Sequence, residues 1–479
     1  MYIIVIPAKA GIQIQHRMAT IDPKIFKAYD IRGIYPTQVD EHGADRIARA
    51  IYTFFKKKLG KDSFTILLAR DMRTSSPVMF EAAKKALLEM GADVVDAGLL
   101  STPTFYFAVY HYGFETGIQI TASHNPKEYT GMKFVLSSPK GIIKIGKSTG
   151  MDDVKEMALS DMEFTPAAKP GSVTTKTGIG ADEIENALKI FKNPKVDTFK
   201  IVADPANAMG ITYLNEAEKK IPMNLIKMNF ELDGTFPVHQ PDPLQLENLV
   251  DLQKRVVEEK ADVGLAPDGD GDRLMFIDEK GELVPPSIIS ALVARELLKE
   301  YPGEKIVIDI RYLLTPKKII EENGGELVDV RVGHAFITQK LQETGGIFGG
   351  ESSGHYYFRD NGGAESQVPV LLCVLKVMTD EKKKLSEIAE QLRRSYESGE
   401  FNFKVTNAQE ILDAVKEKYS DGKLSTVDCI EIDYPTWRFS VRTSNTEPLL
   451  RLNVESYNKE EMETKRDEIM SFIKSLAKE

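Results

Sequence analysis

Three aspartates at alternate positions are the strongest chemical signal in the sequence. Asp268, Asp270 and Asp272 are separated only by glycines in Ala266-Pro-Asp-Gly-Asp-Gly-Asp-Arg273. Carboxylates brought this close together repel one another unless a cation lies between them, and hard divalent cations prefer oxygen ligands. The spacing therefore predicts a divalent metal site. Three protein ligands would leave room on a Mg²⁺ ion for a phosphate oxygen.

An EF-hand calcium loop is one alternative for this motif. Glu279 falls at the twelfth position of such a loop, but Arg273 occupies the sixth, where an EF-hand requires glycine. The flanking segments 263–266 and 274–277 have the apolar character of strands rather than helices. We therefore expect a metal loop between two strands, with a plain acidic turn as the second alternative.

A serine ends a predicted strand elsewhere in the chain. In Gly117-Ile-Gln-Ile-Thr-Ala-Ser-His-Asn-Pro126, the apolar residues indicate a strand that stops where Asn125 and Pro126 turn the chain. Ser123 in this turn is a candidate to carry a phosphoryl group, with free backbone N–H groups facing the anion. The alternative is a turn in which the hydroxyl only caps the local backbone.

Two later loops offer groups for recognition. Gly349-Gly-Glu-Ser-Ser-Gly-His355 surrounds Glu351, Ser353 and His355 with glycines, a set suited to sugar hydroxyls. Arg442-Thr-Ser-Asn-Thr-Glu-Pro448 follows a strand and offers an arginine fork and hydroxyls to an oxyanion, as a phosphate clamp would. A glycine turn with surface polar groups and an Asx-type turn are the respective alternatives.

The segment Gly141-Ile-Ile-Lys-Ile-Gly-Lys-Ser148 matches the P-loop pattern of nucleotide-hydrolysing enzymes. The isoleucines inside the supposed loop are β-branched and favour a strand. The preceding Ser137-Ser-Pro-Lys-Gly141 predicts a hairpin turn after a strand at 132–136. We interpret the match as accidental, and the alternative of a nucleotide hydrolase depends on the loop around Lys147.

A repeated unit positions the first three loops. Strand candidates that end in aspartate lie at 66–71, 201–204 and 306–309, and each is followed by an amphipathic helix and a second strand. Ligands of open α/β sheets bind beyond the carboxyl ends of strands, so the three loops are expected to face one cleft. After residue 392 the pattern changes to a helix, several strands and a closing helix, which indicates a small α+β domain.

Length and composition limit the remaining possibilities. Single hydrophobic cores rarely grow past roughly 250 residues, so 479 residues predict several domains. We expect an α/β protein with three similar domains of mixed, mostly parallel sheets and a C-terminal α+β domain around a central active-site cleft. The expected boundaries are 1–172, 173–280, 281–392 and 393–479. Residues 1–17 suit neither a signal peptide nor a domain start, which makes Met18 a candidate first residue.

The charge balance excludes some partners. The formal net charge is -10 and there is no long basic run, so we expect neither a nucleic-acid nor a membrane partner. No apolar run approaches the length of a membrane span. The 2 cysteines, at positions 373 and 429, cannot form a disulfide framework, which favours a reducing, cytoplasmic location.

Taken together, the four loops resemble those of the α-D-phosphohexomutases, and more closely the bacterial phosphomannomutase/phosphoglucomutase group. The resemblance covers nearly the whole chain from near Lys24, with one loop in each expected domain. It implies a mutase that moves a phosphoryl group reversibly between C1 and C6 of mannose and glucose phosphates. It also implies Mg²⁺, a phosphoserine, a hexose 1,6-bisphosphate as intermediate and activator, a hexose phosphate substrate, and a monomer or homodimer.

The same resemblance assigns roles to individual residues. Ser123 matches the serine that is phosphorylated in the resting enzyme, and this phosphoserine would hold the metal together with Asp268, Asp270 and Asp272. The residues that match groups around the transferring phosphoryl group are Arg32, His124, Lys133, Arg273, His334 and His355. The residues that match sugar contacts are Glu351, Ser353 and His355, and those that match the grip on the substrate's existing phosphate are Arg442, Ser444, Asn445 and Thr446.

Several points of substrate and mechanism remain open at this stage. Asn445 favours hexose mutases over the phosphoglucosamine branch, whereas Arg311 stands where many members have lysine, which leaves the preferred hexose undecided. His355, His334 and Lys133 are all candidates for the general acid or base. The alternatives are a phosphoglucosamine mutase and a metal-dependent sugar phosphatase. We also expect the fourth domain to close over the substrate about a hinge at 386–398.

Overall fold

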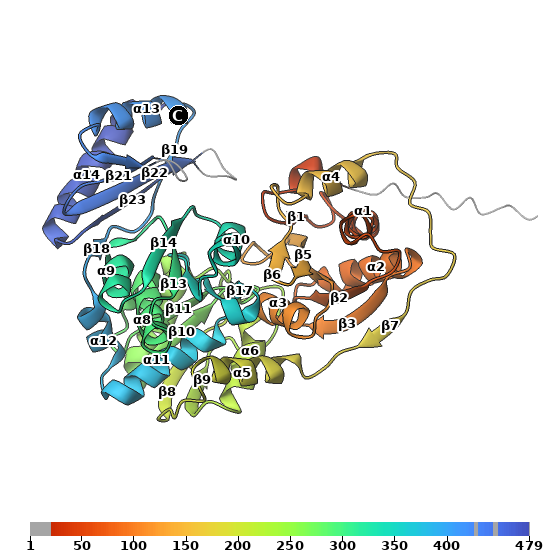
Figure 1. The fold of residues 1–479 in the computed structure, drawn as a ribbon, viewed down its shortest axis with the longest axis horizontal. Coiled ribbons are helices and arrows are strands. Elements are labelled where there is room, and N and C mark those ends of the chain that lie inside the picture. Colours follow the sequence, from red (N-terminus) through yellow and green to blue (C-terminus); the bar gives the residue numbers. More distant parts are fainter. Residues whose placement is uncertain (1–20, 426–429, 444–448, 479) are drawn as a thin grey trace, which may run out of the picture.

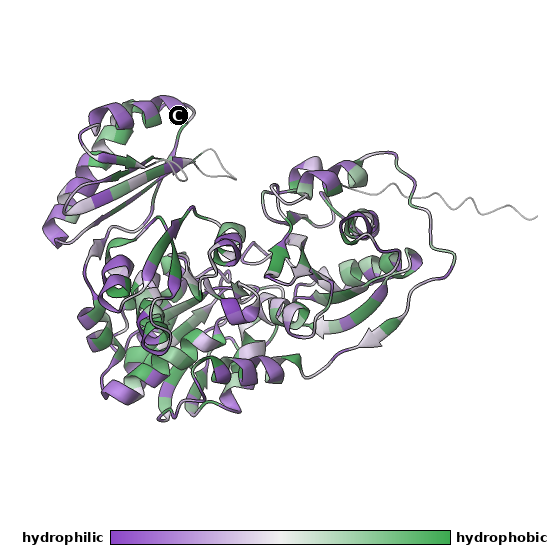
Figure 2. Ribbon diagram, viewed as in Figure 1, coloured by the Kyte–Doolittle hydropathy of each residue, from purple (hydrophilic) through white to green (hydrophobic). Residues whose placement is uncertain are grey.

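The computed structural model describes residues 21–425, 430–443 and 449–478. Four sheets follow one another along these ranges, and helices cover them (Figure 1). Buried side chains of the strands are mainly hydrophobic, while the outer helix faces are mixed or hydrophilic (Figure 2). Within the described residues, no helix combines the length and apolar character needed to cross a membrane. The predicted fold class of three α/β units and a C-terminal α+β unit is confirmed.

The first sheet has the strand order β1-β5-β4-β2-β3-β7, with β6 paired to β5. Its strands are β1 (Ile31–Ile34), β2 (Thr65–Arg70), β3 (Asp93–Leu99), β4 (Thr116–Ile120), β5 (Tyr129–Ser138), β6 (Gly141–Lys144) and β7 (Val173–Thr175). Its helices are η1 (Pro23–Ile25), α1 (Glu41–Leu59), α2 (Ser76–Glu89), α3 (Thr102–His111) and α4 (Met151–Leu159). Strand β7 pairs with β3, so this sheet extends beyond the boundary that we expected at residue 172.

The second and third sheets have the orders β12-β11-β10-β8-β9 and β14-β13-β15-β16-β17. The second unit comprises α5 (Ile179–Ile190), β8 (Phe199–Ala203), α6 (Gly210–Glu218), β9 (Met223–Lys227), η2 (Leu246–Leu249), α7 (Val250–Glu259), β10 (Val263–Pro267), β11 (Leu274–Ile277) and β12 (Leu283–Val284). The third comprises α8 (Pro286–Glu300), β13 (Lys305–Asp309), α9 (Leu314–Glu322), β14 (Glu326–Val330), α10 (His334–Thr344), β15 (Phe348–Gly350), β16 (Tyr356–Phe358), η3 (Arg359–Asn361), β17 (Ala364–Glu365), α11 (Val368–Glu381) and α12 (Leu385–Leu392). Buried side chains of these two units form one continuous hydrophobic cluster.

The predicted repeat is present in each of the three units. The strand, helix and second strand are β2-α2-β3, β8-α6-β9 and β13-α9-β14, and the two strands of each set are parallel. A further parallel strand, β4, β10 or β15, lies on the other side of the first strand and turns back into an antiparallel neighbour. The serine, metal and sugar loops are these three turns, which explains why they occupy equivalent places in their units.

The P-loop match lies in a hairpin of the first sheet. Residues Gly141–Lys144 form strand β6, which pairs antiparallel with β5. The expected hairpin is therefore confirmed, and the supposed nucleotide loop is largely strand.

The fourth unit is an antiparallel sheet with the order β18-β23-β22-β21-β20, with β19 paired to β23. Its elements are β18 (Tyr396–Glu397), β19 (Phe401–Lys404), α13 (Ala408–Lys418), β20 (Lys423–Ser425), β21 (Ile430–Asp433), β22 (Trp437–Thr443), β23 (Leu449–Ser456) and α14 (Lys459–Leu476). Residues from both helices and the central strands form its own hydrophobic core.

The expected hinge at 386–398 was wrong for most of its length. Residues Leu385–Leu392 form α12, whose apolar face belongs to the core shared by the second and third units. The fourth unit also contacts the third through side chains, because Arg438 donates to the carbonyl oxygen of Ile310 at 2.7 Å and Glu455 accepts from the N–H of Leu313 at 2.6 Å. Any hinge is therefore confined to the few residues after Leu392.

A buried carboxyl group joins the first and second units. Glu183 on α5 is 2% exposed and accepts a hydrogen bond from Thr104 Oγ1 on α3 at 2.6 Å. Its second oxygen has no hydrogen-bond partner within residues 21–425, 430–443 and 449–478. Burial raises the pKa of Glu183 from 4.5 to about 7. The neutral form therefore stabilises the fold: this contribution is complete below the unfolded pKa and is lost as the pH rises through the folded pKa.

We expect Glu183→Gln to make stability less dependent on pH. The change in pKa corresponds to about 3 kcal/mol, so the variant should match wild type near pH 4.5 and exceed it by an amount of that order above pH 7. Urea unfolding at several pH values measures the difference. Glu185→Gln, on the same helix with a side chain that is 45% exposed, is the matched control. Parallel pH curves for Glu183→Gln and wild type would contradict the assignment.

Candidate active site

Ser123 lies at the tip of the turn between β4 and β5. Its φ of 52° is in the left-handed region, which costs a non-glycine residue free energy and often occurs at functional sites. The Ser123 N–H donates to Thr121 Oγ1 at 3.0 Å, and the Asn125 N–H donates to the Ala122 carbonyl oxygen at 3.1 Å. These two N–H groups are therefore occupied by the loop itself, although we expected the backbone N–H groups of this turn to be free for an anion. Positive charge close to the loop also comes from side chains.

Arg73 supports this serine loop from behind and was missed in the sequence. Its guanidinium donates to the carbonyl oxygens of Ser123 at 2.7 Å, Asn125 at 2.6 Å and Pro126 at 2.8 Å. The side chain is fully buried and is ion-paired with Asp71 at 3.2 Å. The available signal was an arginine two residues after the aspartate that ends the strand candidate at 66–71.

The metal loop lies between β10 and β11, so the predicted flanking strands are confirmed. All three aspartates are buried, and one oxygen of each lies within 4.8 Å of the others. The Ser123 hydroxyl is 3.5 Å from Asp268 Oδ2. Asp270 Oδ1 is buried and has no hydrogen-bond partner in the part of the chain that the structure describes. This donor set suits a hard divalent cation next to the serine.

Gly269 allows the metal and serine loops to approach each other. A Cβ atom at this position would lie 2.3 Å from the carbonyl oxygen of Ser123, a distance that no side chain tolerates. The glycine between the first two aspartates is therefore required by the contact between two domains.

Lys133 balances part of the carboxylate charge. Its ammonium group lies 2.6 Å from Asp270 Oδ2 and 2.7 Å from Asp272 Oδ2. Burial disfavours the charged lysine, but the two aspartates outweigh this effect and hold the pKa of Lys133 well above its usual value. The pKa of Asp268 is raised by burial and by the other two carboxylates. Positive charge is thus present inside the metal loop, against two of its three carboxylates.

Other polar groups surround the serine hydroxyl. His124 Nδ1 is 3.1 Å from Ser123 Oγ, and burial together with Arg273 and Arg32 holds the pKa of His124 well below its usual value. Arg32 donates to Asn125 Oδ1 at 2.6 Å. The guanidinium of Arg273 is 3.1 Å from Asp242 Oδ1, and its backbone N–H donates to Asp268 Oδ1. A neutral imidazole and two cations therefore lie around Ser123.

The sugar loop contacts the metal loop through His355. Its Nε2 lies 3.1 Å from Asp272 Oδ1, and its Nδ1 lies 2.9 Å from Glu351 Oε2 and 2.8 Å from Ser353 Oγ. Burial alone would lower the pKa of His355, but Asp272 and Glu351 raise it to about 9. Arg311 lies 3.2 Å from Glu351 Oε1, so this loop is a dense network of charges.

The remaining predicted residues lie at the edges of this cluster. His334 begins α10, and its ring meets the edge of Tyr29 with a centroid distance of 5.3 Å. Arg442 near the end of β22 is paired with Glu400 Oε2 at 2.7 Å within the fourth unit. The charge of Glu400 also acts on Arg311 of the third unit. Ser444, Asn445 and Thr446 lie outside the described residues.

Direct contacts therefore join predicted residues of three domains, whereas Arg442 forms its ion pair with Glu400 of its own unit. Ser123, Lys133 and His355 each reach an aspartate of the metal loop. The residues that sequence reasoning missed around this cluster are Tyr29, Arg73, Lys144, Asp242, Asp309, Glu365 and Gln367.

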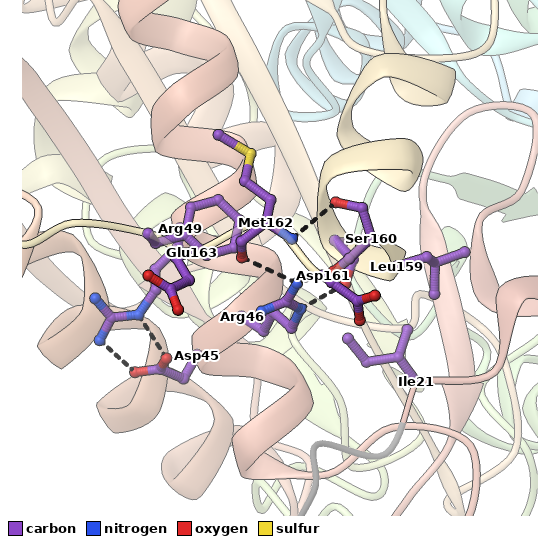
Figure 3. Close-up of a pocket in the computed structure, with 11 residues that line it drawn as sticks. Ile21, Asp45, Arg46, Arg49, Leu159, Ser160, Asp161, Met162 and Glu163 are labelled. Atoms are coloured by element: carbon purple, nitrogen blue, oxygen red, sulfur yellow. Dashed lines mark hydrogen bonds and ion pairs between the residues drawn. The ribbon is translucent and has the colours of Figure 1, made fainter.

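A separate pocket of 710 Å³ lies on the first domain, between α1 and the segment after α4 (Figure 3). Arg46 donates to the carbonyl oxygen of Ala158 at 2.7 Å, and Arg49 is paired with Asp45 at 2.7 Å. Among the described residues that we predicted for the site, none lines this pocket. The guanidinium groups of Arg46 and Arg49 that line it are therefore already paired with oxygens of the protein.

Comparisons with known protein families match the chain to four consecutive domain models. Three models described as phosphoglucomutase/phosphomannomutase, alpha/beta/alpha domains I, II and III, match residues 23–148, 181–281 and 285–396. The C-terminal domain model of the same family matches residues 375–471.

Individual relatives extend over nearly the whole chain. A phosphomannomutase of Methanocaldococcus jannaschii is 37% identical over 95% of this chain and 98% of its own length. A phosphomannomutase of Vibrio cholerae is 35% identical over 94% of this chain and 98% of its own length. The crystal structure of a phosphoglucomutase/phosphomannomutase family protein from Burkholderia thailandensis has a TM-score of 0.82 and 29% identity, and covers 95% of this chain and 98% of that one. This chain is an isomerase that belongs to the phosphoglucomutase/phosphomannomutase family.

Proposed function

We propose that the protein transfers a phosphoryl group reversibly between C1 and C6 of mannose and glucose phosphates. Phospho-Ser123 gives its phosphoryl group to the free end of the sugar, which forms a hexose 1,6-bisphosphate. The bisphosphate then reverses its orientation in the active site, and Ser123 takes back a phosphoryl group from the other end of the sugar. The observation that carries this proposal is the Ser123 hydroxyl 3.5 Å from Asp268, between three carboxylates and several cations.

Asp268, Asp270 and Asp272 would hold Mg²⁺ together with the phosphoserine. Their clustered oxygens, and the unpartnered Asp270 Oδ1, fit a hard divalent ion. When bound, the ion would neutralise charge on the transferring group. Lys133, Arg273 and Arg32 add fixed positive charge around the same position, which is the main means of accelerating phosphoryl transfer.

Proton transfer needs a group that reaches the sugar hydroxyl. His334 and His355 both approach from the third domain, but His355, like Lys133, is held by two carboxylates. We therefore place this role on His334 rather than on His355 or Lys133. Glu351, Ser353 and His355 would also bind the sugar hydroxyls.

Arg442, with Ser444, Asn445 and Thr446, would grip the phosphate that the substrate already carries. We expect Arg442→Ala to raise KM for glucose 1-phosphate by about 10- to 100-fold, because a hydrogen bond to a charged group is worth about 1.5–3 kcal/mol. Steady-state kinetics measures this change. Arg451→Ala is the matched control, because Arg451 lies opposite Arg442 on β23 and also contacts Glu400 at 3.2 Å. An unchanged KM in Arg442→Ala would contradict the clamp.

The proposal is tested by incubating the protein with glucose 1-phosphate or mannose 1-phosphate, Mg²⁺ and trace glucose 1,6-bisphosphate. Formation of the 6-phosphates from both sugars is the expected result. Release of inorganic phosphate instead would favour the sugar phosphatase. Turnover of glucosamine 1-phosphate in preference to both hexoses would favour the phosphoglucosamine mutase.

A further inference from the structure

A buried ion pair joins the first and third domains beside the site. Lys144, the last residue of β6, has its ammonium group 2.5 Å from both carboxylate oxygens of Glu365 on β17. The two residues are 5% and 0% exposed. The ammonium also lies over the rings of Tyr106 at 4.9 Å and Tyr357 at 5.1 Å. Removing two charges from water costs free energy that offsets their attraction, so this pair is weak evidence for a gain in stability. It does show that Lys144 and Glu365 hold each other in a defined position.

The same carboxylate faces His334. His334 Nδ1 lies 3.7 Å from Glu365 Oε1 and has no hydrogen-bond partner among the described residues. The distance is longer than a hydrogen bond of about 2.7–3.2 Å, and a small rotation of the ring would close it. Burial, followed by the charges of Lys144 and Lys133, holds the pKa of His334 well below its usual value, so the imidazole is neutral.

We propose that Glu365 is a positioning residue for His334. Its carboxylate accepts a hydrogen bond from Nδ1–H, which keeps that proton on Nδ1 and leaves Nε2 with a lone pair able to accept a proton from the sugar hydroxyl. Lys144 holds both carboxylate oxygens of Glu365 in place at this buried position. A neutral histidine carries one ring proton, and the hydrogen bond at one nitrogen decides the state of the other. The role of His334 in proton transfer rests on the function proposed above.

The Lys144–Glu365 pair makes the choice of protonated ring nitrogen in His334 depend on how the first domain docks on the third. The hairpin that carries Lys144 is held by the third domain, because the Ile142 N–H donates to the Gly362 carbonyl oxygen at 2.9 Å and Gln342 donates to the Ile142 carbonyl oxygen at 2.7 Å. A Cβ atom at Gly141, whose φ is 131°, would lie 2.2 Å from the Gly362 carbonyl oxygen. Lys144 therefore reaches Glu365 only when this hairpin is seated, and Tyr29 of the first domain packs on the His334 ring in the same arrangement.

The first test is spectroscopic and does not depend on activity. The chain has 7 histidines, so ¹⁵N-histidine labelling with His334→Asn as the assignment variant isolates the His334 signals. We expect wild type to carry the proton on Nδ1. In Lys144→Met/Glu365→Leu, which replaces the pair by apolar side chains, we expect that preference to be lost. Lys144→Arg keeps a cation against the carboxylate and should retain the wild-type pattern. An Nε2-protonated ring in wild type, or an unchanged ring in the double variant, overturns the proposal.

The second test is kinetic. We expect Lys144→Met/Glu365→Leu to lower kcat at least about tenfold with little change in KM, as losses of orienting partners do. In the His334→Asn background, the same double substitution should cost nothing further. An equal fold-loss in both backgrounds would show that the pair acts only through the fold and overturns the positioning role. If wild type has no mutase activity, the proposed function fails, while the spectroscopic test still decides whether Glu365 orients His334.

Discussion

Ser123→Ala is expected to abolish mutase activity, with a fall of more than about three orders of magnitude, because removal of a covalent nucleophile eliminates the intermediate itself. Activity on glucose 1-phosphate is measured with Mg²⁺ and trace glucose 1,6-bisphosphate. In parallel, intact-mass measurement after incubation with the bisphosphate should detect one added phosphoryl group in wild type and none in the variant. The mass measurement separates loss of the acceptor from loss of substrate binding.

The matched control is Lys147→Ala. Lys147 is exposed beside β6 and belongs to the accidental P-loop match. We expect wild-type mutase activity in this variant, since the segment before it is a strand paired with β5. Loss of mutase activity in Lys147→Ala together with full activity in Ser123→Ala would show that Lys147, and not Ser123, belongs to the active site. A phosphorylated Ser123→Ala protein would show that another residue is the acceptor.

The three loops could be predicted from the sequence because each depends on local chemistry. Alternating aspartate and glycine can be recognised without knowledge of the fold, and the strands on either side follow from apolar periodicity. The repeated strand, helix and strand then placed the loops at equivalent turns, between β4 and β5, β10 and β11, and β15 and β16. Because the three units repeat the same order of elements, recognising the local pattern in each unit was enough to predict that the three turns are equivalent.

The supporting residues could not be predicted, because their roles depend on contacts distant in sequence. Arg73 reaches the carbonyl oxygens of a loop that begins 50 residues later, and Lys144 reaches Glu365 across 221 residues. Lys144 has no local pattern that distinguishes it from a surface cation, and the position of Arg73 two residues after an aspartate does not show which loop it contacts. The expected hinge failed for a similar reason: the apolar face of α12 is buried only because the shared core of two domains receives it.

The occupied N–H groups of the serine loop change how phosphate binding is explained. Thr121 Oγ1 accepts from Ser123, so the turn is held in its strained conformation by its own side chains. Anion binding then depends on Arg32, Lys133 and Arg273, which come from different parts of the chain. Long, flexible side chains from different parts of the chain need a rigid backbone beside them. Arg73 supports the serine loop by donating to the Ser123 carbonyl oxygen, and Gly269 packs against the same oxygen.

Divalent metal is expected to have the second-largest effect. Chelation should lower mutase activity by more than about 10²-fold, because several kcal/mol of charge stabilisation in the transition state are lost. Addition of Mg²⁺ should restore activity. Mg²⁺ should also stabilise the fold by about 2.7 kcal/mol at a concentration of 100 times its Kd, through preferential binding to the native state. Thermal unfolding with and without Mg²⁺ measures this second effect independently of turnover.

The Asp268→Asn and Asp270→Asn variants locate that metal. Each removes one charge from three carboxylates whose oxygens lie within 4.8 Å of one another, so each should weaken the Mg²⁺-dependent rise in melting temperature as well as the activity. Asp270 also accepts from Thr102 Oγ1 and pairs with Lys133, so Asp268→Asn is the cleaner of the two. Asp251→Asn, exposed at the start of α7 in the same domain, should keep both effects. If Mg²⁺ stabilised both loop variants as strongly as wild type, the aspartate loop would be an acidic turn, and the buried Lys133 alone would account for its charge balance.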